Sequence, residues 1–296
     1  MNVIEIKDLT KDYGNKKGIF GVNLNVKRGE VFGFLGPNGA GKTTTIRHLM
    51  GFIHSNKGNC LINGMDCSKD SYKIQEILGY LPGEIAFMDD MTGIEFIHFI
   101  ADMKGLKDFN KALELIKMFE LDPKSKIKKM SKGMKQKIGI VCAFMNDPDI
   151  LILDEPTSGL DPLMQNKFVE LILSEKEKGK TIFMSSHLFD EVEKTCDRTA
   201  IIKDGHVVSI ENIKTLSNSK HKSYVITFLN DEMAKEFSKE DFKIKEVTGN
   251  VVTVAVKGDV NPLIKALGKY SVTSLDVKTQ SLEELFMHFY GGESND

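Results

Sequence analysis

The chain has 296 residues and a formal net charge of −2, with 41% hydrophobic residues, 28% charged residues and no Trp. This length and balance predict a globular protein of one large domain, or of one large and one small domain, and exclude a disordered or fibrous chain. The near-neutral charge gives no overall attraction to nucleic acid or to anionic lipid.

The cysteines and the apolar runs indicate where in the cell the chain is expected. The four cysteines form no CxxC pair, and the N-terminal residues MNVIEIKDL lack the pattern of a signal peptide. No apolar stretch approaches the roughly 20 residues that cross a bilayer. We therefore expect a cytoplasmic chain with reduced thiols, which would be peripheral on the inner face of the cell membrane only through a partner.

Apolar runs interleaved with helical patterns make up most of the first 215 residues. Such alternation predicts an α/β domain whose sheet contains parallel strands and is covered on both faces. The strands are expected at Val3–Ile6, Val22–Val26, Val31–Leu35, Ile150–Leu153, Thr181–Ser185 and Thr199–Ile202.

The middle of this domain differs, because its apolar residues recur at helical spacing from about Thr92 to Met145. We expect a helical subdomain, at about residues 84–146, inserted into the sheet domain.

After a polar stretch that begins at Ser217, strand-like and helical segments alternate again. They predict a small separate α+β domain over residues 217–296. Its expected strands are SYVITFL, FKIKEV, NVVTVAV and a last one near Ser271, with a helix from Asn261 and a closing helix from Ser281, where Glu283 and Glu284 suit the helix N-terminus.

The segment GPNGAGKTT follows the predicted strand VFGFL and precedes a helical pattern, which is the context of a phosphate-binding loop. Glycines let backbone amides point at phosphate oxygens at a helix N-terminus. Lys42 can reach the β and γ phosphates, and Thr43 can bind Mg²⁺. The predicted nucleotide-binding residues here are Gly36, Pro37, Asn38, Gly39, Ala40, Gly41, Lys42, Thr43 and Thr44.

A second strand, ILIL, ends in two carboxylates, Asp154 and Glu155, at the sheet edge where ligands of open α/β folds bind. Asp154 would hold the Mg²⁺, and Glu155 would orient or deprotonate the attacking water near the γ phosphate. Together the two motifs predict a P-loop NTPase, and the absence of NKxD leaves guanine recognition unsupported.

Further segments narrow this class: MSKGMKQK at 130–137, SGLD at 158–161, and His187 after the strand TIFMSS. In this order and spacing, the set over residues 1 to about 215 resembles the ATP-binding cassette (ABC) family. The resemblance implies that Ser131 and Gly133 contact the γ phosphate of ATP held by a second subunit. It also implies that His187 contacts the γ phosphate and helps to hold Glu155, and that Tyr13 stacks on adenine.

Two segments depart from the family pattern. Where the family has LSGGQ, this chain reads Met-Ser-Lys-Gly-Met from Met130, which keeps the serine and the second glycine. Where a glutamine follows the Tyr-Leu-Pro run, this chain has Gly83 and Glu84, so Glu84 is a candidate substitute ligand for Mg²⁺. These departures and the C-terminal SLEELFMHFY resemble the type-2 exporter branch, which handles drugs, antibiotics and antimicrobial peptides.

The resemblance implies an ATPase that drives a separately encoded transmembrane permease, as a homodimer or with a paralogous cassette. An importer cassette, and an ABC ATPase acting on ribosomes or DNA, are the alternatives. Lysines cluster between 124 and 137, but Phe119 is the sole aromatic residue near them for base stacking, so we expect no nucleic-acid partner.

Overall fold

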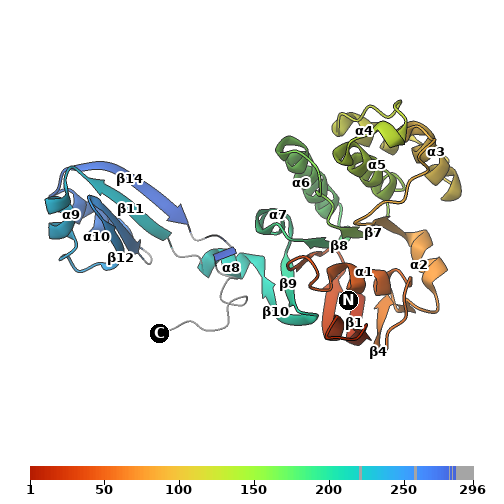
Figure 1. Ribbon diagram of the computed structural model, residues 1–296, viewed down its shortest axis with the longest axis horizontal. Coiled ribbons are helices and arrows are strands. Elements are labelled where there is room, and N and C mark those ends of the chain that lie inside the picture. The colour runs from red at the N-terminus through yellow and green to blue at the C-terminus, as the bar shows by residue number, and fades with distance from the viewer. Residues whose placement is uncertain (220–221, 257–258, 280, 282, 285–296) are drawn as a thin grey trace. The chain divides into compact units, whose positions relative to one another are not determined.

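The computed structural model describes residues 1–219, 222–256, 259–279, 281, 283 and 284. Its contacts divide the chain into two compact units, Met1–Ile213 and Lys214–Asp296 (Figure 1). The sequence had placed the boundary at 215 to 217. Helix α8, Ile213–Ser219, runs through the first part of the polar stretch at this boundary.

The strands of the first unit form two sheets rather than one. The six-stranded sheet has the order β10-β9-β3-β8-β7-β6, in which β10 alone pairs antiparallel. Its strands are β3 (Val31–Leu35), β6 (Leu78–Leu81), β7 (Ile150–Asp154), β8 (Thr181–Ser186), β9 (Arg198–Lys203) and β10 (His206–Asn212).

The second sheet is antiparallel, with the order β2-β1-β4-β5. Its strands are β1 (Asn2–Asp12), β2 (Gly18–Lys27), β4 (Lys57–Ile62) and β5 (Met65–Asp66). All six strands expected from the sequence are present, which confirms the α/β class, while β4, β5, β6 and β10 were not foreseen.

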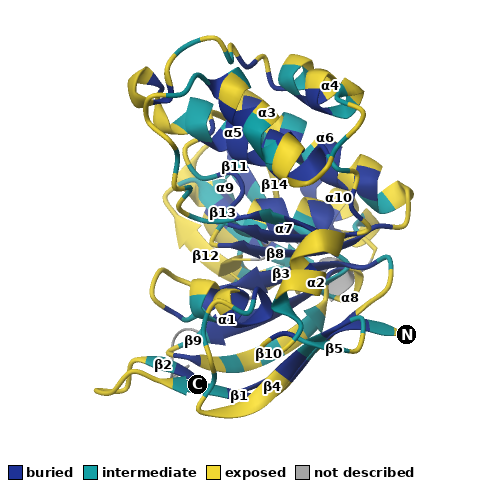
Figure 2. Cartoon of the chain, turned by 90° about the vertical axis from the view of Figure 1, so that its right-hand side faces the viewer, coloured by how far each residue is buried: buried dark blue, intermediate teal, exposed yellow. Residues whose placement is uncertain are grey.

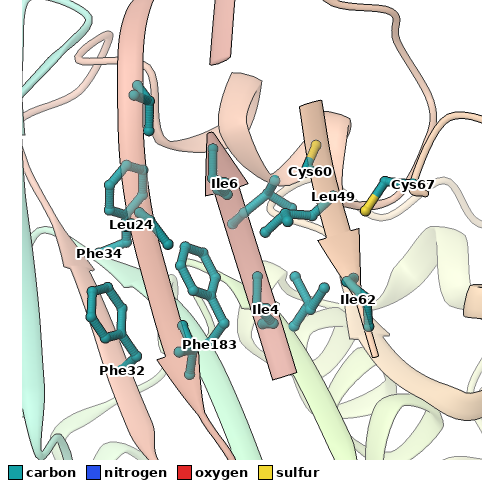
Figure 3. Close-up of a cluster of buried hydrophobic side chains, with 14 of the residues drawn as sticks. Ile4, Ile6, Leu24, Phe32, Phe34, Leu49, Cys60, Ile62, Cys67 and Phe183 are labelled. Atoms are coloured by element: carbon teal, nitrogen blue, oxygen red, sulfur yellow. The ribbon is translucent and has the colours of Figure 1, made fainter. Parts of the chain in front are cut away.

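The main hydrophobic core lies between these two sheets. Phe32, Phe34 and Phe183 from the parallel sheet face Ile4 and other apolar residues of the antiparallel sheet (Figure 3). Figure 2 shows the first helix, α1 (Lys42–Leu49), between the sheets, where Ile46 and Leu49 are fully buried. The core therefore fixes the helix that follows the predicted phosphate loop.

Helices of the first unit confirm the expected helical segment. That segment contains α3 (Gly93–Met103), α4 (Asn110–Met118), the 3₁₀ turn η1 (Ile127–Lys129) and α5 (Lys132–Phe144). Thr92 and Glu95 form a capping box that begins α3. The remaining helices are α2 (Ser71–Ile77), α6 (Pro162–Glu177) and α7 (Phe189–Thr195).

The second unit has a β-α-β-β-α-β order with an antiparallel sheet arranged β12-β13-β11-β14, the pattern of ferredoxin-like domains. Phe228, Phe237 and Leu263 lie in its own core. Its elements are β11 (Lys222–Phe228), α9 (Asp231–Phe237), β12 (Lys243–Thr248), β13 (Val251–Val256), α10 (Asn261–Leu267) and β14 (Val272–Thr279).

Most of the closing helix expected from Ser281 lies outside the described residues. Its first turn carries a reciprocal cap, because the Glu284 amide donates to Ser281 Oγ and the Ser281 amide donates to a Glu284 carboxylate oxygen. Among the described residues, no helix is both long enough and apolar enough to span a bilayer.

Candidate functional site

The phosphate loop connects β3 to α1 and depends on its glycines. Gly39 and Gly41 adopt φ values of 82° and 113°, in a region that side chains disfavour. A Cβ on Gly36 would lie 2.3 Å from the backbone oxygen of Ile202, and one on Gly41 would lie 2.5 Å from Ile19. The loop can therefore take this conformation only with glycine at these positions.

Lys42 begins α1 and is only 6% exposed. Its ammonium group donates to the backbone oxygens of Gly36 (2.5 Å) and Pro37 (3.2 Å). It also lies 3.0 Å from Oε1 of Glu155. The loop thus holds a buried cation over its own backbone, the placement needed to bind phosphate oxygens.

Glu155 joins this cation to a histidine. Its second carboxylate oxygen, Oε2, lies 2.6 Å from Nδ1 of His187, and a carboxylate can only accept, so Nδ1 carries the proton. Glu155 has a φ of 49°, unusual for a residue other than glycine. Its amide donates to the backbone oxygen (3.3 Å) and to Oγ (3.0 Å) of Ser185. Backbone strain of this kind often marks a functional position.

The two strand ends that carry these residues are neighbours in the sheet, because β7 pairs with β8 and Asp154 lies opposite Ser185. Asp154 is fully buried, and its Oδ1 accepts a 2.5 Å hydrogen bond from Ser185 Oγ. Within the described part of the chain, its other oxygen, Oδ2, has no hydrogen-bond partner. A buried carboxylate oxygen left unpaired is costly unless a cation binds it.

A cavity of about 960 Å³ opens beside these groups. Thr43, Glu84 and Asp154 all line it, so the structure brings together the three residues predicted to bind Mg²⁺, and the predicted base Glu155 lines it as well. Oxygen ligands of this kind are those that Mg²⁺ prefers. Asn38 of the phosphate loop lines the same cavity.

Tyr80 also lines the cavity. Burial and, less strongly, the negative charge of Asp154 raise the pKa of its hydroxyl to about 12, while the charge of Arg47 opposes the rise. Tyr80 is therefore a neutral hydrogen-bonding group beside the carboxylates at neutral pH.

The segment that resembles the ABC signature begins α5 and packs on the loop after Glu155. Ser131 caps α5, because its Oγ accepts from the Met134 amide. A Cβ on Gly133 would lie 2.6 Å from the backbone oxygen of Gly159, and Lys132 Nζ donates to Ser158 Oγ at 2.8 Å. This contact couples the start of α5 to the SGLD segment of the same chain.

Of the predicted site residues, Asn38, Thr43, Glu84, Asp154 and Glu155 line the cavity, whereas the rest of the phosphate loop, His187, Ser131, Gly133 and Tyr13 do not. Tyr13 lies in the connection between β1 and β2 with 56% of its surface exposed, and Lys11 Nζ is 5.6 Å from the centre of its ring.

Sequence reasoning missed several residues that support the site. Ser185 bonds Asp154 and the Glu155 amide. Gln136 of α5 donates to the backbone oxygens of Glu155 (3.3 Å) and Pro156 (2.8 Å). Two signals could have identified them. One is the pair of adjacent serines at the end of a buried strand, and the other is a glutamine on an otherwise buried helix face.

Comparisons with known proteins agree with this geometry. A family model described as ABC transporter matches residues 19–158. The bacitracin transport ATP-binding protein BcrA of Bacillus licheniformis is 33% identical over 306 aligned positions, covering 98% of this chain and 98% of BcrA.

Two solved structures share the cassette fold. A structure described as the ATP-binding subunit of an ABC transporter has a TM-score of 0.66 and 30% identity, covering 81% of this chain and 95% of that one. A dimeric post-hydrolysis state of the cassette MJ0796, bound to ADP and Pi, has a TM-score of 0.64 and 26% identity. This match covers 71% of this chain and 98% of the MJ0796 chain.

The family model covers the phosphate loop, Asp154 and Glu155, and the alignment with BcrA spans 98% of this chain. The chain therefore belongs to the ABC transporter family, as an ATP-binding subunit with the fold and ATPase activity of its cassettes.

Proposed function

We propose that this chain is the motor of an exporter, in which two cassettes close on ATP and drive a separate membrane permease. The observation that carries the proposal is the linked set Lys42, Glu155 and His187 beside the phosphate loop. The similarity to BcrA, a bacitracin transport ATP-binding protein, over nearly its whole length supports an antibiotic-like cargo.

Each group in the linked set has a role in the hydrolysis of ATP. The loop amides and Lys42 bind the phosphates and neutralise charge that develops in the transition state. Glu155 orients the attacking water and takes up its proton. His187 fixes the Glu155 carboxylate through the 2.6 Å contact and, as the family resemblance implies, would contact the γ phosphate.

The oxygen groups of the cavity fit a magnesium ion. Asp154, Thr43 and Glu84 would hold it, with the unpaired Oδ2 of Asp154 as the principal protein ligand and Glu84 in place of the glutamine usual in the family. When bound, Mg²⁺ neutralises charge on the β and γ phosphates.

Ser131 and Gly133 would act on ATP held by the partner cassette. Both lie at the N-terminus of α5, whose amides and dipole attract phosphate oxygens. Because ATP then contributes to both faces of the interface, the closed dimer binds ATP better than ADP, and hydrolysis removes that difference. Tyr13, exposed near the start of β2, is available to stack on adenine.

Glu155→Gln tests this proposal. The amide keeps the shape of the side chain but cannot take up a proton, so ATP should bind and remain intact. We expect turnover to fall by about 100-fold or more. The mass of the variant by light scattering should be that of a dimer with ATP and Mg²⁺ and of a monomer with ADP.

Glu170→Gln, which changes an exposed carboxylate on α6, is the matched control and should turn over ATP like the unmodified chain. Full turnover in Glu155→Gln would contradict the role of Glu155. A monomer with both nucleotides would contradict closure by two copies of this chain alone.

A further inference from the structure

Glu191 on α7 is a buried carboxyl group to which the proposed chemistry gives no role. It is 6% exposed, and its Oε2 accepts a 2.6 Å hydrogen bond from Ser186 Oγ. The side chain of Thr157 lies close to the same carboxyl group. Oε1 is buried and has no hydrogen-bond partner among the described residues.

The bond to Ser186 joins α7 to the loop that carries His187. Ser186 directly precedes His187, and its Oγ also accepts from the Leu188 amide at 3.0 Å, so the hydroxyl bridges the histidine loop to Glu191. Thr157 lies in the turn that follows Glu155. One side chain of α7 therefore bonds the His187 loop and lies close to the turn after Glu155.

The surroundings of Glu191 favour its neutral form. Burial and, less strongly, the charge of Glu155 raise the pKa of the carboxyl group to about 7, although the Ser186 and Thr157 hydroxyls act to lower it. Cys196, the residue after α7, is close enough to feel the charge of Glu191, while Lys176 of the adjacent α6 pairs with Asp197. The neighbouring strands β3 and β8 contribute no charged side chain.

We propose that Glu191 is a positioning residue for ATP hydrolysis, whose protonated carboxyl group holds the His187 loop in place beside the Glu155 turn and whose ionisation slows turnover. An ionised Glu191 would place a second negative charge near Glu155, with the Ser186 hydroxyl as its one hydrogen-bond donor among the described residues. Such a charge displaces one of the two loops or draws in water. The inference rests on the roles proposed above for Glu155 and His187.

The test compares the unmodified chain with Glu191→Gln and Glu191→Ala, measuring kcat and KM for ATP across the pH range. Glutamine mimics the protonated carboxyl group and cannot ionise. The ratio of kcat in Glu191→Gln to kcat in the unmodified chain should rise about tenfold from about pH 6 to about pH 8, because one unit above the pKa leaves about a tenth of the carboxyl groups protonated.

Glu191→Ala should lower kcat at every pH, with KM for ATP changed little, since Glu191 lies behind the loops and touches neither Lys42 nor the phosphate loop in any recorded contact. Rescue by glutamine but not by alanine at low pH supports positioning. Glu170→Gln on α6 is the control and should keep the pH profile of the unmodified chain.

A kcat ratio for Glu191→Gln that stays constant with pH would overturn the inference, as would equal loss of kcat in Glu191→Gln and Glu191→Ala at low pH. A different result, full turnover in Glu155→Gln, would contradict the roles proposed for Glu155 and His187. Because that measurement uses another variant and needs only one pH, failure of the proposed function can be told apart from failure of the inference about Glu191.

Discussion

At the scale of single residues, Asp154 depends on Ser185. The serine hydroxyl is the one hydrogen-bond donor recorded for the buried Asp154 carboxylate among the described residues, and the Glu155 amide donates to the same oxygen of the serine. Removing a donor from a buried charged group leaves that group unsatisfied and costs about 1–3 kcal/mol. Ser185 therefore supports both the proposed magnesium ligand and the proposed base.

We expect Ser185→Ala to lower the free energy of unfolding by about 2 kcal/mol in a urea titration. The Mg²⁺ concentration that gives half-maximal ATP hydrolysis should also rise, because the carboxylate loses the bond that orients it. Ser174→Ala, an exposed position on α6, is the control. Unchanged stability together with an unchanged Mg²⁺ requirement would contradict this role.

At the scale of elements, the start of α5 rests directly on the backbone after Glu155. Only a glycine fits at position 133, because a Cβ there would lie 2.6 Å from the Gly159 oxygen. Gly133→Ala should displace the helix N-terminus at an overpacking cost of about 1–3 kcal/mol. If that terminus binds the partner's ATP, the cost appears in dimer formation.

Measured by light scattering in the Glu155→Gln background, Gly133→Ala should weaken the ATP-bound dimer about tenfold. Binding of ATP to the monomer should stay the same. Gly268→Ala in the second unit is a matched control, since a Cβ there meets its nearest neighbour at 3.4 Å, an ordinary contact. An unaffected dimer in Gly133→Ala would count against the two-cassette arrangement.

At the scale of the whole molecule, the two units have separate hydrophobic cores, one between the two cassette sheets and one in the β-α-β-β-α-β unit. The residues of the proposed nucleotide site all belong to the first unit. ATP should therefore stabilise that unit alone, by about 2.7 kcal/mol when its concentration is 100 times the dissociation constant.

Calorimetry of Glu155→Gln should show two transitions, of which one moves up by about 5–10 °C with ATP and Mg²⁺ while the other stays in place. ADP should move the same transition less, because it lacks the γ phosphate that the site binds. A single transition that moves as a whole would mean that the two units unfold together and would contradict this expectation.

Local sequence was enough to predict the strands of the first unit, the helical insertion and the phosphate loop. The reason is that the glycines of GPNGAGKTT and the carboxylates after ILIL can be recognised from only a few neighbouring residues in the sequence. The strand alternation of the second unit was equally local, which is why SYVITFL and NVVTVAV fall within or beside β11 and β13.

Tertiary structure decided which distant residues meet. β3, β7 and β8 are neighbours in the parallel sheet although they lie far apart in the sequence, so the contacts of Glu155 with Lys42 and His187 follow from strand order. The split of the cassette into two sheets also depends on pairing between distant strands, which alternation of apolar residues does not specify. Ser185 and Glu191 carry no motif, and their importance follows only from burial and from the hydroxyl and carboxyl groups that packing places beside them.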